Sequence, residues 1–181
     1  MAAMPDIREA LLDAAYDVAV TTGWQRARMV DVAAAAGVSR QTLYDQFGDR
    51  DGLARALALR ETGRFLDGVE RAMSGADDVA AAVGKAAAYA LKAARDNPLI
   101  RSILTEDGGL LPYMTTRAEP LVAAATKRLT AYAAERWPGL DVAEAAEVVV
   151  RLALSYIVLP GPGAAARIAA VAERVLERVP S

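Results

Sequence analysis

Apolar residues recur at steps of three and four positions along most of this chain, and charged residues fall between them. In the segment from Ile7 to Ala19, Leu11 and Ala15 lie on one face of a helical wheel. Asp13 and Asp17 lie on the other face. This spacing is that of an amphipathic α-helix, and no segment shows the strict alternation that marks a half-buried strand. The pattern predicts an all-α protein.

Glycine, proline and capping residues divide this pattern into about nine helices. Gly23 ends the first helix, Ser39 is placed to cap the third, and Asp49 is placed to cap a long fourth helix. Pro98 suits the first position of a short sixth helix. The helices are expected at about residues 7–22, 28–36, 39–47, 49–73, 79–97, 98–106, from between 116 and 121 to 137, 141–159 and 164–179.

The starts of two later helices depend on capping patterns. Thr116 and Glu119 have the spacing of a capping box, but Pro120 suits the first helical position equally well. The start of that helix is therefore open. Asp141 and Glu144 have the spacing of an aspartate-headed box, which predicts that the next helix opens at Asp141.

Two breaks between helices indicate the domain organisation. Residues 107–113 include Gly108, Gly109 and Pro112 and are expected to form a loop. The break at 74–77 separates the first four helices from the others. We expect a three-helix domain at residues 1–50, a connecting helix at 49–74 and a larger helical bundle at 75–181.

The composition supports a helical protein and removes most catalytic chemistry. Hydrophobic residues make up 54% of the chain but aromatic residues only 6%, so alanine, a strong helix former, carries much of the apolar content. Cysteine and histidine are both absent, which excludes disulfides, thiolate and imidazole metal ligands, and Ser-His-Asp or Cys-His catalysis. We expect no catalytic residues, no metal site and no cofactor.

Adjacent carboxylates are the remaining candidates for acid–base chemistry. They occur at Asp77 with Asp78 and at Glu106 with Asp107. Neighbouring helical residues diverge by about 100 degrees, so these pairs are expected to cap or solvate helix ends.

No targeting or membrane segment is evident, and net charge gives no sign of a nucleic-acid partner. The start has no cationic region followed by an apolar run. The richest apolar stretch, from Ala145 to Pro160, contains Glu147 and Arg151 and is shorter than the roughly 20 residues of a membrane span. We expect a soluble, cytoplasmic protein without a membrane partner. The net charge is −2, so any case for DNA must rest on pattern.

That pattern is present between Met29 and Phe47. Ala33 is small where a second helix crosses closely, and Gly37 can adopt the left-handed conformation that a turn requires. The positions that a helix-turn-helix needs are occupied by Val32, Ala33, Gly37, Val38 and Leu43.

The opposite face of the 39–47 helix presents polar side chains. Gln41 can pair bidentately with adenine, while Arg40 can take guanine or phosphate, a choice that stays open. The Tyr44 hydroxyl can donate to a phosphate. Thr42 can do the same or bond back to its own helix. Asp45 shares this face.

The run from Gly37 to Phe47, followed by Asp49 to Leu53, resembles the signature of the TetR family of bacterial transcription regulators. The resemblance covers residues 6–60, and the combination is specific. It implies a helix-turn-helix that binds operator DNA and a C-terminal bundle that senses a small molecule and dimerises. It also implies DNA contacts at Arg28, Arg40, Gln41, Thr42, Tyr44, Gln46 and Arg50.

Four positions depart from the family pattern. Ala27 stands where a threonine often caps the second helix, and Gln46 replaces a common histidine. Arg50 stands where a phosphate-binding lysine is usual, at a helix N-terminus that favours anions. Asp45 places a carboxylate close to DNA, where it repels phosphate unless it accepts from a cytosine amine or turns aside. We expect modest, salt-sensitive affinity.

Two further sites are expected in the C-terminal bundle. The helix from Ala145 to Leu159 is apolar nearly all round and needs cover on both sides. With the helix from Ala164 to Val179, it would form the two-fold four-helix interface that the family resemblance implies, and a palindromic operator requires a dimer. The interface residues expected are Leu152, Tyr156, Leu159, Val171, Val175 and Leu176. The pocket residues expected come from helices that surround the pocket in similar proteins, and they are Tyr89, Ile103, Leu104, Tyr113, Met114, Leu129, Tyr132, Trp137 and Tyr156.

These observations predict a ligand-responsive regulator, most simply a repressor released from its operator by a lipophilic effector. Its partners would be double-stranded operator DNA, an unidentified small molecule and a second copy of the chain. Two alternatives stay open: a helical DNA-binding protein without an inducer, and a helical enzyme that processes a small molecule. The lack of histidine and cysteine disfavours the enzyme.

Overall fold

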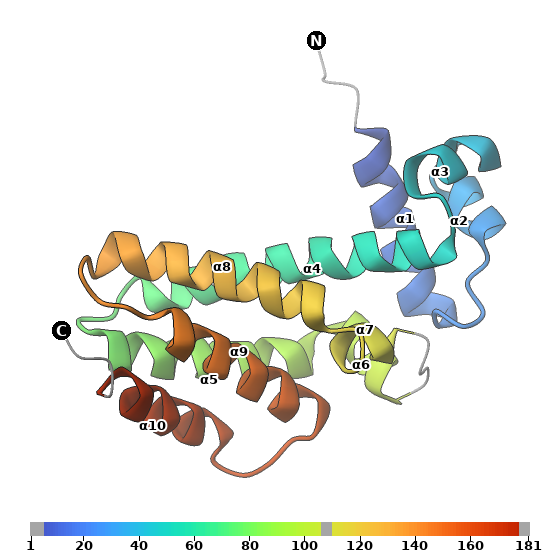
Figure 1. The fold of residues 1–181 in the computed structure, drawn as a ribbon. Helices are drawn as coiled ribbons and strands as arrows, with labels where there is room; N and C mark the ends of the chain where they lie inside the picture. The colour runs from blue at the N-terminus through green and yellow to red at the C-terminus, as the bar shows by residue number, and fades with distance from the viewer. Residues whose placement is uncertain (1–5, 106–109, 178–181) are drawn as a thin grey trace. The chain divides into compact units, whose positions relative to one another are not determined.

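The computed structural model describes residues 6–105 and 110–177, and within these ranges the chain forms ten helices and no strand (Figure 1). The predicted all-α fold is confirmed. The helices are α1 (Ile7–Thr22), α2 (Met29–Ala35), α3 (Arg40–Phe47), α4 (Arg50–Met73), α5 (Val79–Asp96), α6 (Pro98–Thr105), α7 (Leu111–Met114), α8 (Glu119–Arg136), α9 (Ala143–Val158) and α10 (Ala164–Leu176).

One helix was missed, because α7 lies in the segment expected to be a loop. The Tyr113 side chain is buried and its hydroxyl donates to the Asp51 carbonyl at 3.5 Å. This burial stabilises one helical turn although Pro112 lies within it. The expected glycines of the loop, Gly108 and Gly109, lie outside the described residues, as do Glu106 and Asp107 of the expected carboxylate pair.

The first residues of two later helices, α8 and α9, differ from the expected positions. Helix α8 begins at Glu119, and its N-cap residue Ala118 makes no side-chain cap. Pro120 is therefore the second helical residue, one position later than the proline alternative expected, and the Thr116 capping box does not form the N-cap. Helix α9 begins at Ala143 rather than Asp141. The Asp141 carboxylate accepts from the Ala143 N–H at 3.2 Å, so it satisfies a helix-end donor from outside the helix.

The predicted caps of α3 and α4 are confirmed. The Ser39 hydroxyl accepts from the Thr42 N–H at 3.0 Å, and the Asp49 carboxylate accepts from the Gly52 N–H at 2.7 Å. Asp78 accepts from the Ala81 N–H at 2.7 Å at the start of α5, which is the capping role expected for one member of that carboxylate pair.

By contacts between Cα atoms the chain divides into two compact units. The first contains residues 1–60 and 97–113, and the second contains 61–96 and 114–181. Helix α4 supplies residues to both. The sequence expectation grouped residues 97–113 with the C-terminal bundle, whereas in this division they group with the N-terminal helices.

The first unit surrounds a core of leucines. Helix α1 packs on α2 and on α6, and α2 packs on α3. Leu11, Leu43 and Leu57 are fully buried. Burial of side chains of this size contributes about 1.5–3 kcal/mol each relative to exposure.

The second unit is a bundle with many alanines at its contacts. Helix α10 packs on α5 and α9, and α9 also packs on α8. Ile168 and Ala172 of α10 are fully buried with Ala87 and Val149. Small side chains let these helices approach closely. In the described ranges, no helix has both the length and the hydropathy needed to cross a bilayer.

Candidate functional site

The turn between α2 and α3 has the geometry that the sequence predicted. Gly37 has a φ of +69°, in the left-handed region, and the Val38 N–H donates to the Ala33 carbonyl at 3.0 Å. A Cβ at Gly37 would meet nothing within 4 Å, so the glycine is required by the backbone conformation and not by space. Val32, Ala33 and Leu43 are buried where the two helices pack.

The outward face of α3 carries the polar residues expected to read DNA. Arg40, Gln41, Tyr44 and Asp45 are exposed, and Tyr44 keeps 39% of its surface accessible. Leu43 points into the core together with Phe47. The face is therefore polar and accessible, as a helix that enters the major groove must be.

Asp45 turns aside to Gln41. The Gln41 Nε2 donates to the Asp45 Oδ1 at 2.7 Å, one turn along the helix. This was one of the alternatives considered for a carboxylate on this face, and it leaves the carboxylate bonded to a neutral amide.

Thr42 bonds within its own helix. Its Oγ1 lies 2.8 Å from the Ser39 Oγ, which also accepts from the Thr42 N–H. Of the two roles open to this hydroxyl, the local bond is the one present in the free chain.

The start of α2 lacks a side-chain cap, as the alanine at position 27 suggested. Arg28 occupies the N-cap and makes no capping bond, and Ala27 is buried. Arg28 instead forms a two-bond pair with Asp31, at 2.9 and 3.0 Å. The hydrogen bonds from this guanidinium hold the pKa of Asp31 below its ordinary value. The Arg28 side chain is nevertheless largely exposed.

Two arginines link segments of this unit through hydrogen bonds and contacts with aromatic rings. The Arg50 guanidinium donates to the Trp24 carbonyl and lies 5.3 Å from the centre of the Trp24 ring. Arg8 donates to the Gln46 carbonyl at 3.0 Å and lies 4.5 Å from the centre of the Phe47 ring. Sequence analysis missed Arg8 and Trp24, because each partner lies 26 or more positions away along the chain.

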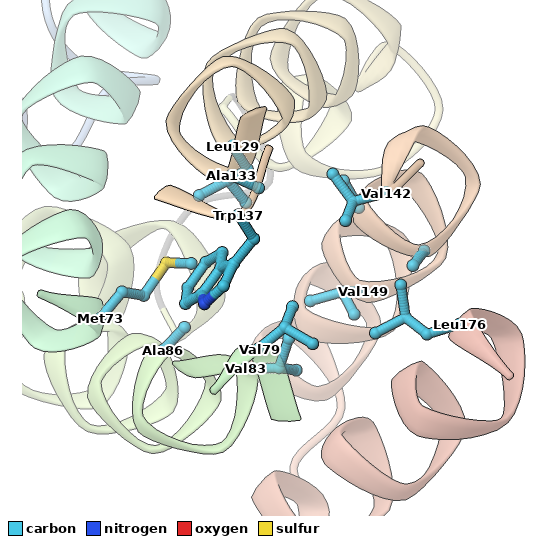
Figure 2. Close-up of a pocket in the computed structure, with 12 residues that line it drawn as sticks. Met73, Val79, Val83, Ala86, Leu129, Ala133, Trp137, Val142, Val149 and Leu176 are labelled. Carbon is cyan, nitrogen blue, oxygen red and sulfur yellow. The ribbon is translucent and has the colours of Figure 1, made fainter. Parts of the chain in front are cut away.

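The second unit contains an apolar cavity of about 50 Å³ (Figure 2). Figure 2 shows the Trp137 ring turned toward Met73 and Ala86, with Val149 and Leu176 on the other side. Five helix regions contribute, and every lining residue is aliphatic, aromatic or methionine. The lining residues are Met73, Val79, Val83, Ala86, Leu129, Ala133, Trp137, Val142, Ala145, Ala146, Val149 and Leu176.

The residues expected to line a pocket are distributed over both units. Leu129 and Trp137 line the cavity. Tyr89 and Tyr132 pack on the core beside it, where Tyr132 meets the Trp137 ring edge at 6.4 Å. Ile103, Leu104 and Tyr113 belong to the first unit, and Met114 and Tyr156 belong to the second. The valines of α5 and α9 were missed because an apolar residue inside a helix reads as ordinary core.

The residues expected at a dimer interface are only partly covered in the single chain. Leu159 keeps 77% of its surface exposed at the end of α9. Leu152 and Tyr156 are half-buried against the α5 and α10 contact. Val171, Val175 and Leu176 of α10 are half-buried as well.

Comparison with known proteins identifies a family that has this arrangement of helices. The model described as "Bacterial regulatory proteins, tetR family" matches residues 11–57, and the model of the bacterial tetracycline repressor C-terminal domain matches residues 78–178. The HTH-type transcriptional regulator AlkX of Mycobacterium tuberculosis is 36% identical over 162 residues, which cover 85% of this chain and 76% of that protein.

Solved structures agree over nearly the whole chain. The TetR family repressor AlkX from Dietzia sp., implicated in biodegradation of n-alkanes, is 29% identical with a TM-score of 0.78, over 97% of this chain and 96% of that one. A TetR-family regulator from Streptomyces coelicolor has the same fold, with 23% identity and a TM-score of 0.63 over 97% and 100% of the two chains. The turn geometry, the polar α3 face and these matches together show that the chain belongs to the TetR family and is a DNA-binding transcription regulator.

Proposed function

We propose that this TetR-family regulator is a repressor that binds operator DNA as a homodimer and releases it when an apolar small molecule enters the cavity of the second unit. The observation that supports the ligand-sensing part of the proposal is the cavity, because it is lined by apolar side chains from five helix regions. Such a site favours a lipophilic ligand. The proposal gives the chain no catalytic reaction and places its action in the cytoplasm, where chromosomal DNA lies.

The proposed DNA contacts divide by chemistry. Gln41 reads a base edge, and Arg40 takes a guanine or a phosphate. The remaining contacts position the protein on the phosphates through charged, hydroxyl or amide groups. These are Arg28, Thr42, Tyr44, Gln46 and Arg50. Because Asp31 pairs with Arg28 and Asp45 adds a carboxylate to the exposed face of α3, net positive charge on this face is small, and we expect modest nonspecific affinity.

The proposed dimer supplies two recognition helices. One helix-turn-helix contacts a single half-site, so a palindromic operator needs a second copy. The accessible Leu159 side chain directly after α9 and the half-buried apolar side chains of α9 and α10 support this pairing. Burial of such a patch between two copies removes apolar surface from water.

The proposed effector is a molecule with an unbranched alkyl chain. The cavity lining offers no charged group to neutralise a buried ionic head. The Dietzia relative is implicated in biodegradation of n-alkanes, and the chemistry of that class fits an aliphatic lining. A polar head group, if the molecule has one, would stay outside the cavity.

The proposed signal passes along α4. Its last residue, Met73, lines the cavity, while residues 50–60 belong to the first unit. A ligand that displaces Met73 shifts this helix and changes the separation of the two recognition helices. A coupling free energy of about 1–3 kcal/mol is sufficient.

The test compares operator release by wild type and a cavity-filling variant. DNA from the protein's own upstream region is footprinted, and its release is followed by fluorescence anisotropy against n-alkanes and n-alkanols of increasing length. Val149→Phe should bind this DNA like wild type but lose the response, because the added ring occupies the cavity. Leu140→Phe is the control, since Leu140 is exposed and lies outside the lining.

Three results would count against the proposal. If wild type ignores every compound in the series, the sensing half fails and a regulator without an inducer remains. If Val149→Phe responds as well as wild type, the effector does not bind in this cavity. A wild-type sample that shows no footprint at low salt removes the operator half.

A further inference from the structure

We propose that Asp45 is a positioning residue for base recognition: it orients the Gln41 amide and, through its own charge, weakens binding to DNA of every sequence. The inference rests on the proposed contact between Gln41 and a base. It extends that proposal, because Asp45 itself is assigned no contact with DNA.

The first step is geometric. Gln41 and Asp45 lie four residues apart on the exposed face of α3, and Gln41 Nε2 donates to Asp45 Oδ1 at 2.7 Å. Residues at this spacing are neighbours on a helix surface, and a Gln followed by Asp at i+4 is a stabilising pair. The bond therefore holds the end of an otherwise mobile side chain in one orientation.

The second step is the inventory of hydrogen-bonding groups. A glutamine amide has two N–H donors and one carbonyl acceptor. The bond to Asp45 uses one donor, so one N–H and the Oε1 stay available. These are the groups that pair with N7 and the N6 amine of adenine in the major groove. Because the amide is already oriented, less side-chain entropy is lost when the base is bound.

The third step concerns charge. In the described part of the chain, the Asp45 carboxylate forms no ion pair, and its side-chain hydrogen bond is to the neutral amide of Gln41. The negative charge on the groove-facing helix is therefore not cancelled. It repels phosphates wherever the helix docks, so it lowers affinity for all sequences alike. Positioning raises the ratio of specific to nonspecific binding, whereas the repulsion lowers both affinities and leaves that ratio unchanged.

Two substitutions separate these effects. Asp45→Asn removes the charge but keeps an oxygen that accepts from the Gln41 amide. Asp45→Ala removes both. Because position 45 is exposed on the surface of α3, both variants should fold, and their melting temperatures are measured to confirm it. Gln41→Ala is the matched control that removes the base-reading group.

The full-length proteins are used to select from a library of randomised DNA duplexes, and each enriched pool is sequenced. Affinity for a scrambled duplex is measured in parallel. Asp45→Asn and Asp45→Ala should both bind scrambled DNA about two- to fivefold more tightly than wild type. Asp45→Asn should select the wild-type motif. Asp45→Ala should lose about two- to threefold in preference at one position of each half-site.

The control identifies that position. Gln41→Ala should lose base preference at the same position, and adding Asp45→Ala to it should cause no further loss there. If Asp45→Ala selects the wild-type motif with undiminished preference while Gln41→Ala does not, positioning by Asp45 is overturned. If neither Asp45 variant gains affinity for scrambled DNA, the repulsive role is overturned. If wild type itself enriches no motif, the proposed function fails, and this inference with it.

Discussion

Gly68 of α4 faces the Tyr89 ring of α5 at a distance that leaves no room for a side chain. A Cβ on Gly68 would lie 1.8 Å from the Tyr89 hydroxyl oxygen. Glycine within a helix costs about 1 kcal/mol relative to alanine, so its place here is explained by this close approach. Gly63 lies in the same helix, and a Cβ there would meet nothing within 4 Å.

We predict opposite outcomes for alanine at these two glycines. Gly68→Ala should lower the free energy of unfolding by about 1–3 kcal/mol, because the ring of Tyr89 must move. Gly63→Ala should raise it by up to about 1 kcal/mol, because only helix propensity changes. Urea unfolding monitored by circular dichroism measures both. A rise in the free energy of unfolding for Gly68→Ala would show that the clash at Tyr89 is relieved without cost, and a fall for Gly63→Ala would contradict the propensity argument.

At the scale of elements, one arginine joins α8 to α4. Arg128 donates from Nε and Nη2 to the two oxygens of Glu70, at 2.6 and 2.7 Å, and from Nη2 to Asp67 at 2.5 Å. Its Nη1 donates to the Gly63 carbonyl at 3.0 Å. The hydrogen bonds to Glu70, followed by those to Asp67, raise the pKa of Arg128 above its ordinary value. The contact residues follow one face of α4 at helical spacing.

This contact should require the guanidinium shape as well as the charge. Arg128→Lys retains the charge but loses the planar fork, so we expect the free energy of unfolding to fall by about 1 kcal/mol. The loss is limited because the Arg128 side chain is 33% exposed. Denaturant unfolding gives the value.

The matched control is Arg151→Lys. Arg151 pairs with Glu147 one turn away on α9 and its side chain is 52% exposed, so a change below about 0.5 kcal/mol is expected. Equal losses at the two positions would mean that the link between α8 and α4 contributes no more than a surface pair.

At the scale of the whole molecule, the exposed residue after the end of α9 is expected to affect dimer formation. Leu159, directly after α9, is 77% exposed, and a large apolar side chain this accessible is a candidate for burial between two copies. We predict that Leu159→Glu yields monomers, because two carboxylates would be buried in the proposed interface. Light scattering after size-exclusion chromatography should give half the wild-type molar mass.

The same variant should lose operator binding, since a single recognition helix grips too little DNA. Leu140→Glu is the control, because Leu140 precedes α9, whereas Leu159 follows it, and Leu140 is already 36% exposed. It should remain dimeric. Full operator affinity in a monomeric Leu159→Glu sample would contradict the need for a dimer.

Sequence-based predictions agree best with the structure where the feature depends only on residues within one turn of helix. Ser39 and Asp49 cap helices through bonds that span three residues, and Gly37 meets the need of its own turn. The pair of Gln41 and Asp45 also has a local spacing, but the sequence pattern indicated only that Asp45 can turn aside and did not identify Gln41 as its partner. Helix α7 was missed because the burial of Tyr113 outweighs the proline in that turn.

By itself, the order of residues determined the helical class, the crossed helices α2 and α3, the polar outward face of α3, and the absence of the side chains on which most catalysis depends. Only the tertiary structure decided that Trp137 and Val149 border a cavity, that Arg128 reaches Glu70 and that Arg50 braces Trp24. The physical reason is range. Helix periodicity and capping act over about four residues, whereas packing joins side chains tens of positions apart. Many apolar residues in the chain are chemically similar, so the sequence does not show which of them form a given contact.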